Sequence, residues 1–187
     1  MAALNRIRCM LRVNHAGEVG ADAIYAGQSA RIPPESQPHG PIIQHMWTQE
    51  KAHLEKFNGL LVEHRVRPSL LDPLWKVAGY TAGYVTAALG PKAAMACTEA
   101  VETVIGEHYN DQIRELIEIP EADLSPEERK AVDELRECIS KFRNEELEHL
   151  DTAVEQGSGD ANDVGMELLK GVVRGGCRVA IEVAKRV

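Results

Sequence analysis

The chain has 187 residues, which is enough for one domain with a sizeable core or at most two small ones. Hydrophobic residues make up 44% of it but aromatic residues only 4%, so the core must be built mainly from aliphatic side chains and alanine. The formal net charge of −8 argues against a general nucleic-acid-binding protein, which would normally present a basic face.

The N-terminal part of the chain predicts two helices joined by a loop. The first helix runs from about residue 5 to 30, and Pro33 and Pro34 prevent it from continuing. The second runs from about residue 42 to 66, because its apolar residues recur at helical rather than alternating spacing. Pro68 closes this second helix.

A third predicted helix, from about residue 70 to 90, is unusually apolar and crosses between the two halves of the chain. Residues 77–91 carry no charge, but this stretch is shorter than the about 20 apolar residues that a membrane-spanning helix needs. One interpretation is a core helix packed against the bundle. The other is a helix lying in a membrane interface, anchored by the amphipathic side chains of Trp75, Tyr80 and Tyr84.

Three further helices are predicted in the C-terminal part. The fourth runs from about residue 92 to 119, and the fifth begins at the Ser-Pro-Glu-Glu sequence of residues 125–128, which has the order of a capping box. The fifth ends near residue 156, and the last begins near Asp160 or Asn162. Helices with short loops, and no convincing strand, predict an all-α fold in a single domain spanning residues 1–187.

The chain carries a similar arrangement of acidic residues twice, at about residues 5–66 and 92–156. In each half, a helix with a lone Glu precedes a helix with a Glu-x-x-His motif. Residues three apart lie on one helix face and can reach one ion. Four carboxylates and two imidazoles from four helices form the ligand set of di-iron and di-manganese bundles. The predicted metal ligands are Glu18, Glu50, His53, Glu102, Glu146 and His149.

This ligand set suits iron or manganese better than zinc, whose structural sites favour Cys and His. A single Glu-x-x-His motif is usually part of a solvated helix face, but two copies in a helical duplication are far more specific. Two rival ligands remain. Glu145 lies on the same helix face as His149, although the match between the two halves of the chain favours Glu146 as the ligand. Glu99, one turn before Glu102, is the second rival.

Longer motifs surround these ligands, among them residues 14–20 (NHAGEVG), 47–53 (WTQEKAH), 107–110 (EHYN) and 142–149 (FRNEELEH). With these motifs the chain resembles the demethoxyubiquinone hydroxylases over nearly its whole length, from about residue 6 to 187. Ferritins and ribonucleotide reductases share the ligand scheme but not these flanking residues. The resemblance therefore implies a ferritin-like four-helix bundle with two additional helices.

The resemblance also implies roles for the six ligands and a reaction. Glu50 and Glu146 would bridge two iron ions, Glu18 and Glu102 would be the single-helix ligands, and His53 and His149 would each bind one ion. The family hydroxylates the quinone ring of a demethoxyubiquinone in the penultimate step of ubiquinone synthesis. Dioxygen is the oxidant and NADH supplies the electrons.

The resemblance further implies a location and partners. Eukaryotic members act at the matrix side of the mitochondrial inner membrane with a lipid-binding partner protein, and bacterial members share the motifs. We therefore expect a peripheral protein of that membrane or, alternatively, of the cytoplasmic side of a bacterial plasma membrane. The expected partners are a polyprenyl quinone, the membrane surface and that lipid-binding protein, with a homo-oligomer of the chain as a further option, and no nucleic acid.

His108 and Tyr109 are candidate catalytic residues on the fourth predicted helix. Tyr109 follows Glu102 by seven residues, close to two helical turns, so the two side chains should face roughly the same way. Tyr109 is either a packed, hydrogen-bonded tyrosine or a contact to the quinone or to an electron route. The sequence has no Gly-x-Gly-x-x-Gly after a strand, so we expect no Rossmann site for NADH.

Three rival functions share some of these features: an iron-storage ferritin, a peroxide-reducing enzyme like rubrerythrin, and a non-enzymatic membrane-associated bundle. Rubrerythrin-like enzymes often carry an additional Cys-rich iron site, and this chain has no C-x-x-C pair. Its four cysteines are interpreted as reduced thiols in a reducing compartment. No secretory signal is evident at the N-terminus.

Overall fold

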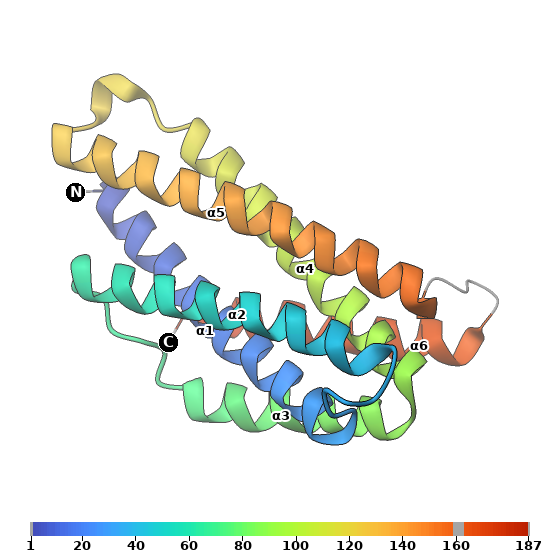
Figure 1. Cartoon of the computed structure of the whole chain (residues 1–187). Coiled ribbons are helices and arrows are strands. Elements are labelled where there is room, and N and C mark those ends of the chain that lie inside the picture. Colours follow the sequence, from blue (N-terminus) through green and yellow to red (C-terminus); the bar gives the residue numbers. More distant parts are fainter. Residues whose placement is uncertain (1, 159–162, 187) are drawn as a thin grey trace.

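A computed structural model of the protein describes residues 2–158 and 163–186. Within these residues the chain forms α-helices, two short helical turns and no β-strand (Figure 1). The α-helices are α1 (Ala2–Arg31), α2 (His39–Glu63), α3 (Asp72–Ala88), α4 (Pro91–Ile117), α5 (Pro126–Ala153) and α6 (Val164–Ala184). This confirms the predicted all-α fold.

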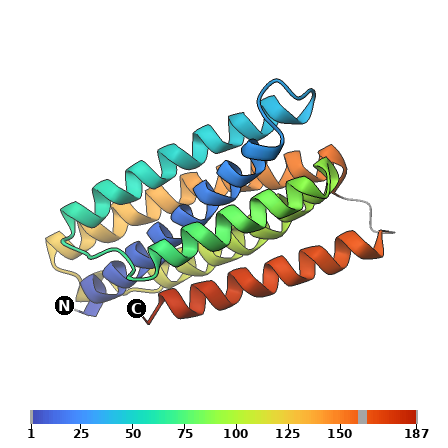
Figure 2. The ribbon, with the colours of Figure 1, turned by 90° about the horizontal axis from the view of Figure 1, so that it is seen from below.

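Each half of the chain is organised around one long helix. Helix α1 packs mainly on α2 and α3, and helix α4 packs mainly on α5 and α6. Helices α1, α2, α4 and α5 form the four-helix bundle, and α3 and α6 lie against its outside, next to α1 and α4 respectively (Figures 1 and 2). The predicted bundle with two additional helices is therefore confirmed.

Some helix ends follow directly from local sequence. The hydroxyl of Ser125 accepts from the backbone N–H of Glu128 at 3.2 Å, and the Glu128 carboxylate accepts from the backbone N–H of Ser125 at 3.2 Å. This is the predicted capping box at the start of α5. Helix α6 begins after Asp163, whose carboxylate accepts from two backbone N–H groups. The predicted start near residue 160 or 162 lies outside the described residues.

Other helix ends differ from the prediction by a few residues. Helix α2 spans His39–Glu63 instead of residues 42–66. It stops early because Arg65 adopts a left-handed backbone conformation with φ of 54°, which is incompatible with a continuing α-helix. Helix α5 ends at Ala153 and continues as one π-helical turn, Val154–Ser158, so the predicted end near residue 156 falls within this turn.

Glycine permits an unusually close approach of α3 to α1. A Cβ atom on Gly83 would lie 2.0 Å from the backbone oxygen of Ile24, and one on Gly27 would lie 2.3 Å from the backbone oxygen of Tyr80. Any larger residue would push the two helices apart. The apolar third helix is therefore packed along one edge, as the core interpretation requires, while its other side remains exposed.

Two apolar clusters of the buried core lie toward the two ends of the bundle. The first includes Ile7, Leu60, Leu116 and Leu135, and the second includes Tyr25, Ile43, Met95 and Ala153. On each of the four bundle helices, the predicted metal ligands lie in the sequence between the residues of these two clusters. The acidic layer thus has apolar side chains on both sides along the bundle, which shield it from water at the two bundle ends.

Candidate metal centre

The structure brings the six predicted metal ligands together in the middle of the bundle. Their side chains come from α1, α2, α4 and α5, and each residue is between 0% and 2% exposed: Glu18, Glu50, His53, Glu102, Glu146 and His149. They form two overlapping groups, in each of which the ligand atoms lie within 4.8 Å of one another. Glu50 and Glu146 belong to both groups, which is the arrangement that two bridging carboxylates would have.

The two imidazole rings point the same nitrogen toward the acids. Nδ1 of His53 lies 3.2 Å from the Glu146 carboxylate and 3.7 Å from that of Glu18. Nδ1 of His149 lies 3.1 Å from Glu50 and 3.1 Å from Glu146. Each ring can therefore offer Nδ1 to an ion placed among the carboxylates.

The unsatisfied polar atoms of the cluster fit a pair of metal ions. Within the described part of the chain, both carboxylate oxygens of Glu50 and of Glu146 are buried without a hydrogen-bond partner, as is Nδ1 of both His53 and His149. Leaving so many buried polar atoms unpaired is costly. Divalent cations would supply the missing partners and neutralise the carboxylates, so these residues could hold a dinuclear centre.

The electrostatics of the cluster lead to the same conclusion. Burial, and then the charges of Glu50 and Glu146, raises the pKa of Glu18 well above its ordinary range. Glu102 has a raised pKa for the same reasons. Burial alone would lower the pKa of His149, but the nearby carboxylates of Glu146, Glu50 and Glu102 together outweigh burial and raise that pKa to about 11. Without metal the cluster must therefore retain protons, which bound cations would displace.

Two tyrosines hold the single-helix acids in a crossed pattern. The hydroxyl of Tyr25, on α1, donates to Glu102, on α4, at 2.8 Å. The hydroxyl of Tyr109, on α4, donates to Glu18, on α1, in a short hydrogen bond. Tyr109 was predicted to face the same way as Glu102, and its partner is the equivalent acid of the other half. Tyr25 was not predicted as a site residue, although it follows Glu18 by seven residues as Tyr109 follows Glu102.

His108, the other predicted catalytic residue, lies outside both metal-ligand groups. Its Nε2 atom is 2.8 Å from the amide nitrogen of Gln112, and the Gln112 amide also pairs with Asn14 at 2.8 and 2.9 Å. Burial, and then the charge of Lys185, lowers the pKa of His108 to about 4. The neutral ring accepts a hydrogen bond from Gln112, so His108 belongs to a polar network between α1 and α4.

The two rival acids occupy other positions. Glu99 lies 2.7 Å from Lys170 and 3.2 Å from Arg174, so it anchors α6 against α4. Glu145 accepts from Nε2 of His53, the ring nitrogen that faces away from the cluster, at 2.7 Å. Neither Glu99 nor Glu145 belongs to the metal-ligand groups.

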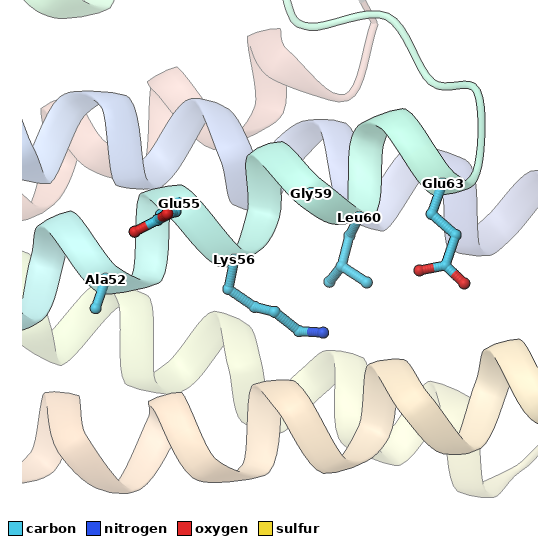
Figure 3. A pocket seen from close by; sticks show the side chains of 6 residues that line it. All are labelled: Ala52, Glu55, Lys56, Gly59, Leu60 and Glu63. Carbon is cyan, nitrogen blue, oxygen red and sulfur yellow. The ribbon is translucent and has the colours of Figure 1, made fainter.

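A cleft between α2 and α5 reaches the cluster from the surface. It has a volume of about 590 Å³, and its lining includes Gln49, His53, Phe142 and Glu145. A second hollow of about 440 Å³ continues along α2 and shares Lys56 with the cleft. Figure 3 shows Lys56 and other side chains of this hollow pointing toward α5. Polar groups on this face of the bundle therefore lead to His53, a predicted ligand.

Comparison with known proteins places the chain in a family. The family model described as ubiquinone biosynthesis protein COQ7 matches residues 5–184. A human protein named NADPH-dependent 3-demethoxyubiquinone 3-hydroxylase, mitochondrial, is 48% identical, with an alignment that covers 100% of this chain and 79% of the human one. A 3-demethoxyubiquinol 3-hydroxylase of Rhodospirillum rubrum is 42% identical over 95% of this chain and 76% of its own. The chain belongs to the COQ7 family of ubiquinone biosynthesis proteins.

Proposed function

We propose that this protein hydroxylates the quinone ring of a demethoxyubiquinone at a carboxylate-bridged di-iron centre. The observation that carries the proposal is the buried cluster of four carboxylates and two imidazoles in a chain whose relatives are named for that reaction. Overall, one oxygen atom of dioxygen enters the ring and the other becomes water, while a reduced nicotinamide nucleotide supplies two electrons.

Bound iron would supply the activation of dioxygen. The residues of the chain would hold and orient the reactants. Glu50 and Glu146 belong to both ligand groups, so they would help to hold both ions. Tyr25 and Tyr109 would keep the remaining two acids in orientation through their hydrogen bonds. The apolar clusters at both ends of the bundle would exclude bulk water from the reacting atoms.

The electron donor in this proposal is NADH, whereas the mammalian relatives carry the name NADPH-dependent. The two donors differ by one phosphate group, so they can be compared directly in the same assay. Because the described part of the chain has no β-strand, neither donor can use a Rossmann unit here. In this proposal the nucleotide contacts the surface of the helices.

The hydroxylation assay uses the iron-loaded protein, a short-tailed demethoxyubiquinone analogue, NADH or NADPH, and dioxygen labelled with ¹⁸O. We expect a product that contains one labelled oxygen atom and whose amount follows nucleotide oxidation. Absence of product from a protein that holds two irons would leave the fold and the metal centre standing but would exclude the proposed reaction. An iron-storage role would require a large shell, which light scattering would detect.

We further propose that the protein associates peripherally with a membrane, where a polyprenyl quinone is dissolved. None of the described helices is long and apolar enough to cross a bilayer. Helices α3 and α6 both lie outside the bundle (Figure 2), and both expose large apolar side chains. On and beside α3 these are Leu74, Val77, Tyr80, Tyr84, Val85 and Leu89, between 42% and 70% exposed. On α6 they are Val164, Leu168, Val172 and Val179, between 64% and 81% exposed.

Tyr80 and Tyr84 are exposed, as the predicted membrane anchors would need to be, but Trp75 is not placed in the same way. Trp75 is partly buried and packs against Val13, Ala16 and Ala184, with its indole nitrogen enclosed. Its position at the start of α3 directs the ring toward α1 and α6. Trp75 therefore contributes to packing, and the interfacial role falls to the two tyrosines and the aliphatic side chains.

Flotation with liposomes tests the membrane proposal. The variant carries Val85→Asp and Leu89→Asp, and the matched control carries Val62→Asp on α2, where an exposed valine lies outside α3 and α6. We expect the double variant to fold and to stay at the bottom of the gradient, while the control floats with the vesicles. If the folded double variant still floats, this surface does not bind the membrane.

The proposed location is the matrix side of the mitochondrial inner membrane, or the cytoplasmic side of a bacterial plasma membrane. The names of the human and yeast relatives include the word mitochondrial, and that of the Rhodospirillum rubrum relative does not. The proposed protein partner is a lipid-binding protein that delivers the quinone. Cross-linking in isolated membranes, followed by mass spectrometry, would identify such a partner and any further copy of the chain.

A further inference from the structure

The residue before each Glu-x-x-His motif contacts the histidine of the other motif. Glu145, on α5, lies with a carboxylate oxygen 2.7 Å from Nε2 of His53, on α2. Gln49, on α2, lies with its amide oxygen 3.0 Å from Nε2 of His149, on α5. The two hydrogen bonds therefore cross between α2 and α5, and Gln49, Glu145 and His53 all line the cleft between these helices.

These contacts fix the orientation of both rings relative to the carboxylates. An acceptor at Nε2 keeps the ring proton on Nε2, so the lone pair of Nδ1 remains available toward the cluster. Nδ1 is the atom that lies 3.2 Å from Glu146 in His53 and 3.1 Å from Glu146 in His149. Each ring is thus held from outside in the orientation that lets it bind an ion inside.

The two outer partners differ in charge. Glu145 offers a carboxylate to His53, whereas Gln49 offers a neutral amide to His149. A hydrogen bond to a carboxylate is shorter and stronger than one to an amide, and it makes the imidazole a better electron donor. The ring of His53 is also clamped by Phe142, which stacks on it with ring centroids 4.0 Å apart. Of the two ion positions, the one at His53 therefore has the more rigidly held histidine ligand.

We propose that Glu145 and Gln49 are positioning residues for the two ion positions, and that Glu145 makes the position at His53 the tighter of the two. The proposal rests on the dinuclear centre proposed above and adds that its two positions are unequal. The difference between the two halves that substitution can exchange is a carboxylate beside His53 and an amide beside His149. Exchanging these groups should therefore change the two affinities in opposite directions.

The test is a titration of the metal-free protein with Co²⁺, followed by the visible absorption of the bound ion. The wild type should bind two ions with distinct dissociation constants. In Glu145→Gln the smaller of the two dissociation constants should rise by about 10- to 100-fold, while the larger remains unchanged, so that the two values converge. In Gln49→Glu the larger dissociation constant should fall instead. Glu148→Gln makes the same chemical change on the same helix at an exposed position and should leave both constants unchanged.

The possible failures are distinguishable. Unchanged constants in a folded Glu145→Gln protein would overturn this proposal alone, and so would an equal weakening of both constants, which would indicate a general structural role. A wild-type protein that binds fewer than two Co²⁺ ions would overturn the dinuclear centre itself and this proposal with it. If Glu145→Gln does not fold, Gln49→Glu carries the test, because a weaker constant that fails to tighten overturns the proposal.

Discussion

Removing the metal and raising the pH should destabilise this protein, because its centre then contains buried carboxylates that resist ionisation. Burial, and then the charge of Glu146, raises the pKa of Glu50 from 4.5 to about 7. Between these values the unfolded chain releases its proton while the folded chain keeps it, so a rise in pH favours unfolding. At about 1.4 kcal/mol per pKa unit, Glu50 alone should cost about 3 kcal/mol of stability across this range.

The neighbouring histidines act in the same direction. Burial alone would lower the pKa values of His53 and His149, but the nearby carboxylates, Glu146 foremost, raise them from 6.5 to about 10 and about 11. The stability that they contribute is complete below pH 6.5 and is lost as the pH rises toward those values. Glu146 itself has its pKa lowered to about 2, so its contribution changes only below pH 4.5. Between pH 5 and 8 these groups together lower the free energy of unfolding of the metal-free protein as the pH rises.

The assay is urea unfolding of the metal-free protein at pH 5, 6, 7 and 8, followed by circular dichroism. Wild type should lose stability steadily over this range, and Glu50→Gln should remove about 3 kcal/mol of the loss. Glu148→Gln, an exposed change on α5, should retain the full dependence. A metal-free wild type that is as stable at pH 8 as at pH 5 would refute the reasoning, as would a Glu50→Gln variant with an undiminished decline.

Three further substitutions test separate parts of the structure. Tyr109→Phe removes the hydrogen bond to Glu18 and should lower the rate of hydroxylation. It should also lower the free energy of unfolding by about 1–3 kcal/mol. Unchanged rates of nucleotide oxidation and hydroxylation would exclude a functional role for Tyr109. Gly83→Ala should destabilise the fold by about 2 kcal/mol or more in thermal unfolding, since α1 blocks its Cβ, whereas Gly175→Ala, with open space, should stabilise slightly. Ser125→Ala should cost about 1 kcal/mol in urea unfolding, and no loss would mean that the capping box is unimportant.

The fold and the cluster were predictable because their signals are local. Apolar periodicity marks each helix, and the spacing of three between Glu50 and His53 places both on one helix face. The repetition of that motif at Glu146 and His149 required no knowledge of how the helices pack. The structure brings all of these residues into one buried layer, with their ligand atoms within 4.8 Å of one another in each group.

Contacts between helices were harder to predict, because they depend on how the two halves face each other. The spacing of seven residues places Tyr109 on the same helix face as Glu102, but its hydroxyl donates a hydrogen bond to Glu18 of the neighbouring helix α1. From the sequence alone Glu145 is a rival metal ligand beside His149 of its own helix, whereas in the structure it contacts His53 of α2. Gln49 gave no signal by itself, although its position before Glu50 matches that of Glu145 before the second motif.

The metal content of the protein and of three variants tests the central claim most directly. The metal-free chain is loaded with Fe²⁺ without oxygen, desalted and analysed for iron per chain. We expect two irons in the wild type, about one in Glu18→Ala and in Glu102→Ala, and none or nearly none in Glu146→Ala, because Glu146 belongs to both ligand groups. A wild type without iron, or a Glu146→Ala protein that still holds two, would contradict a dinuclear centre built from these six residues.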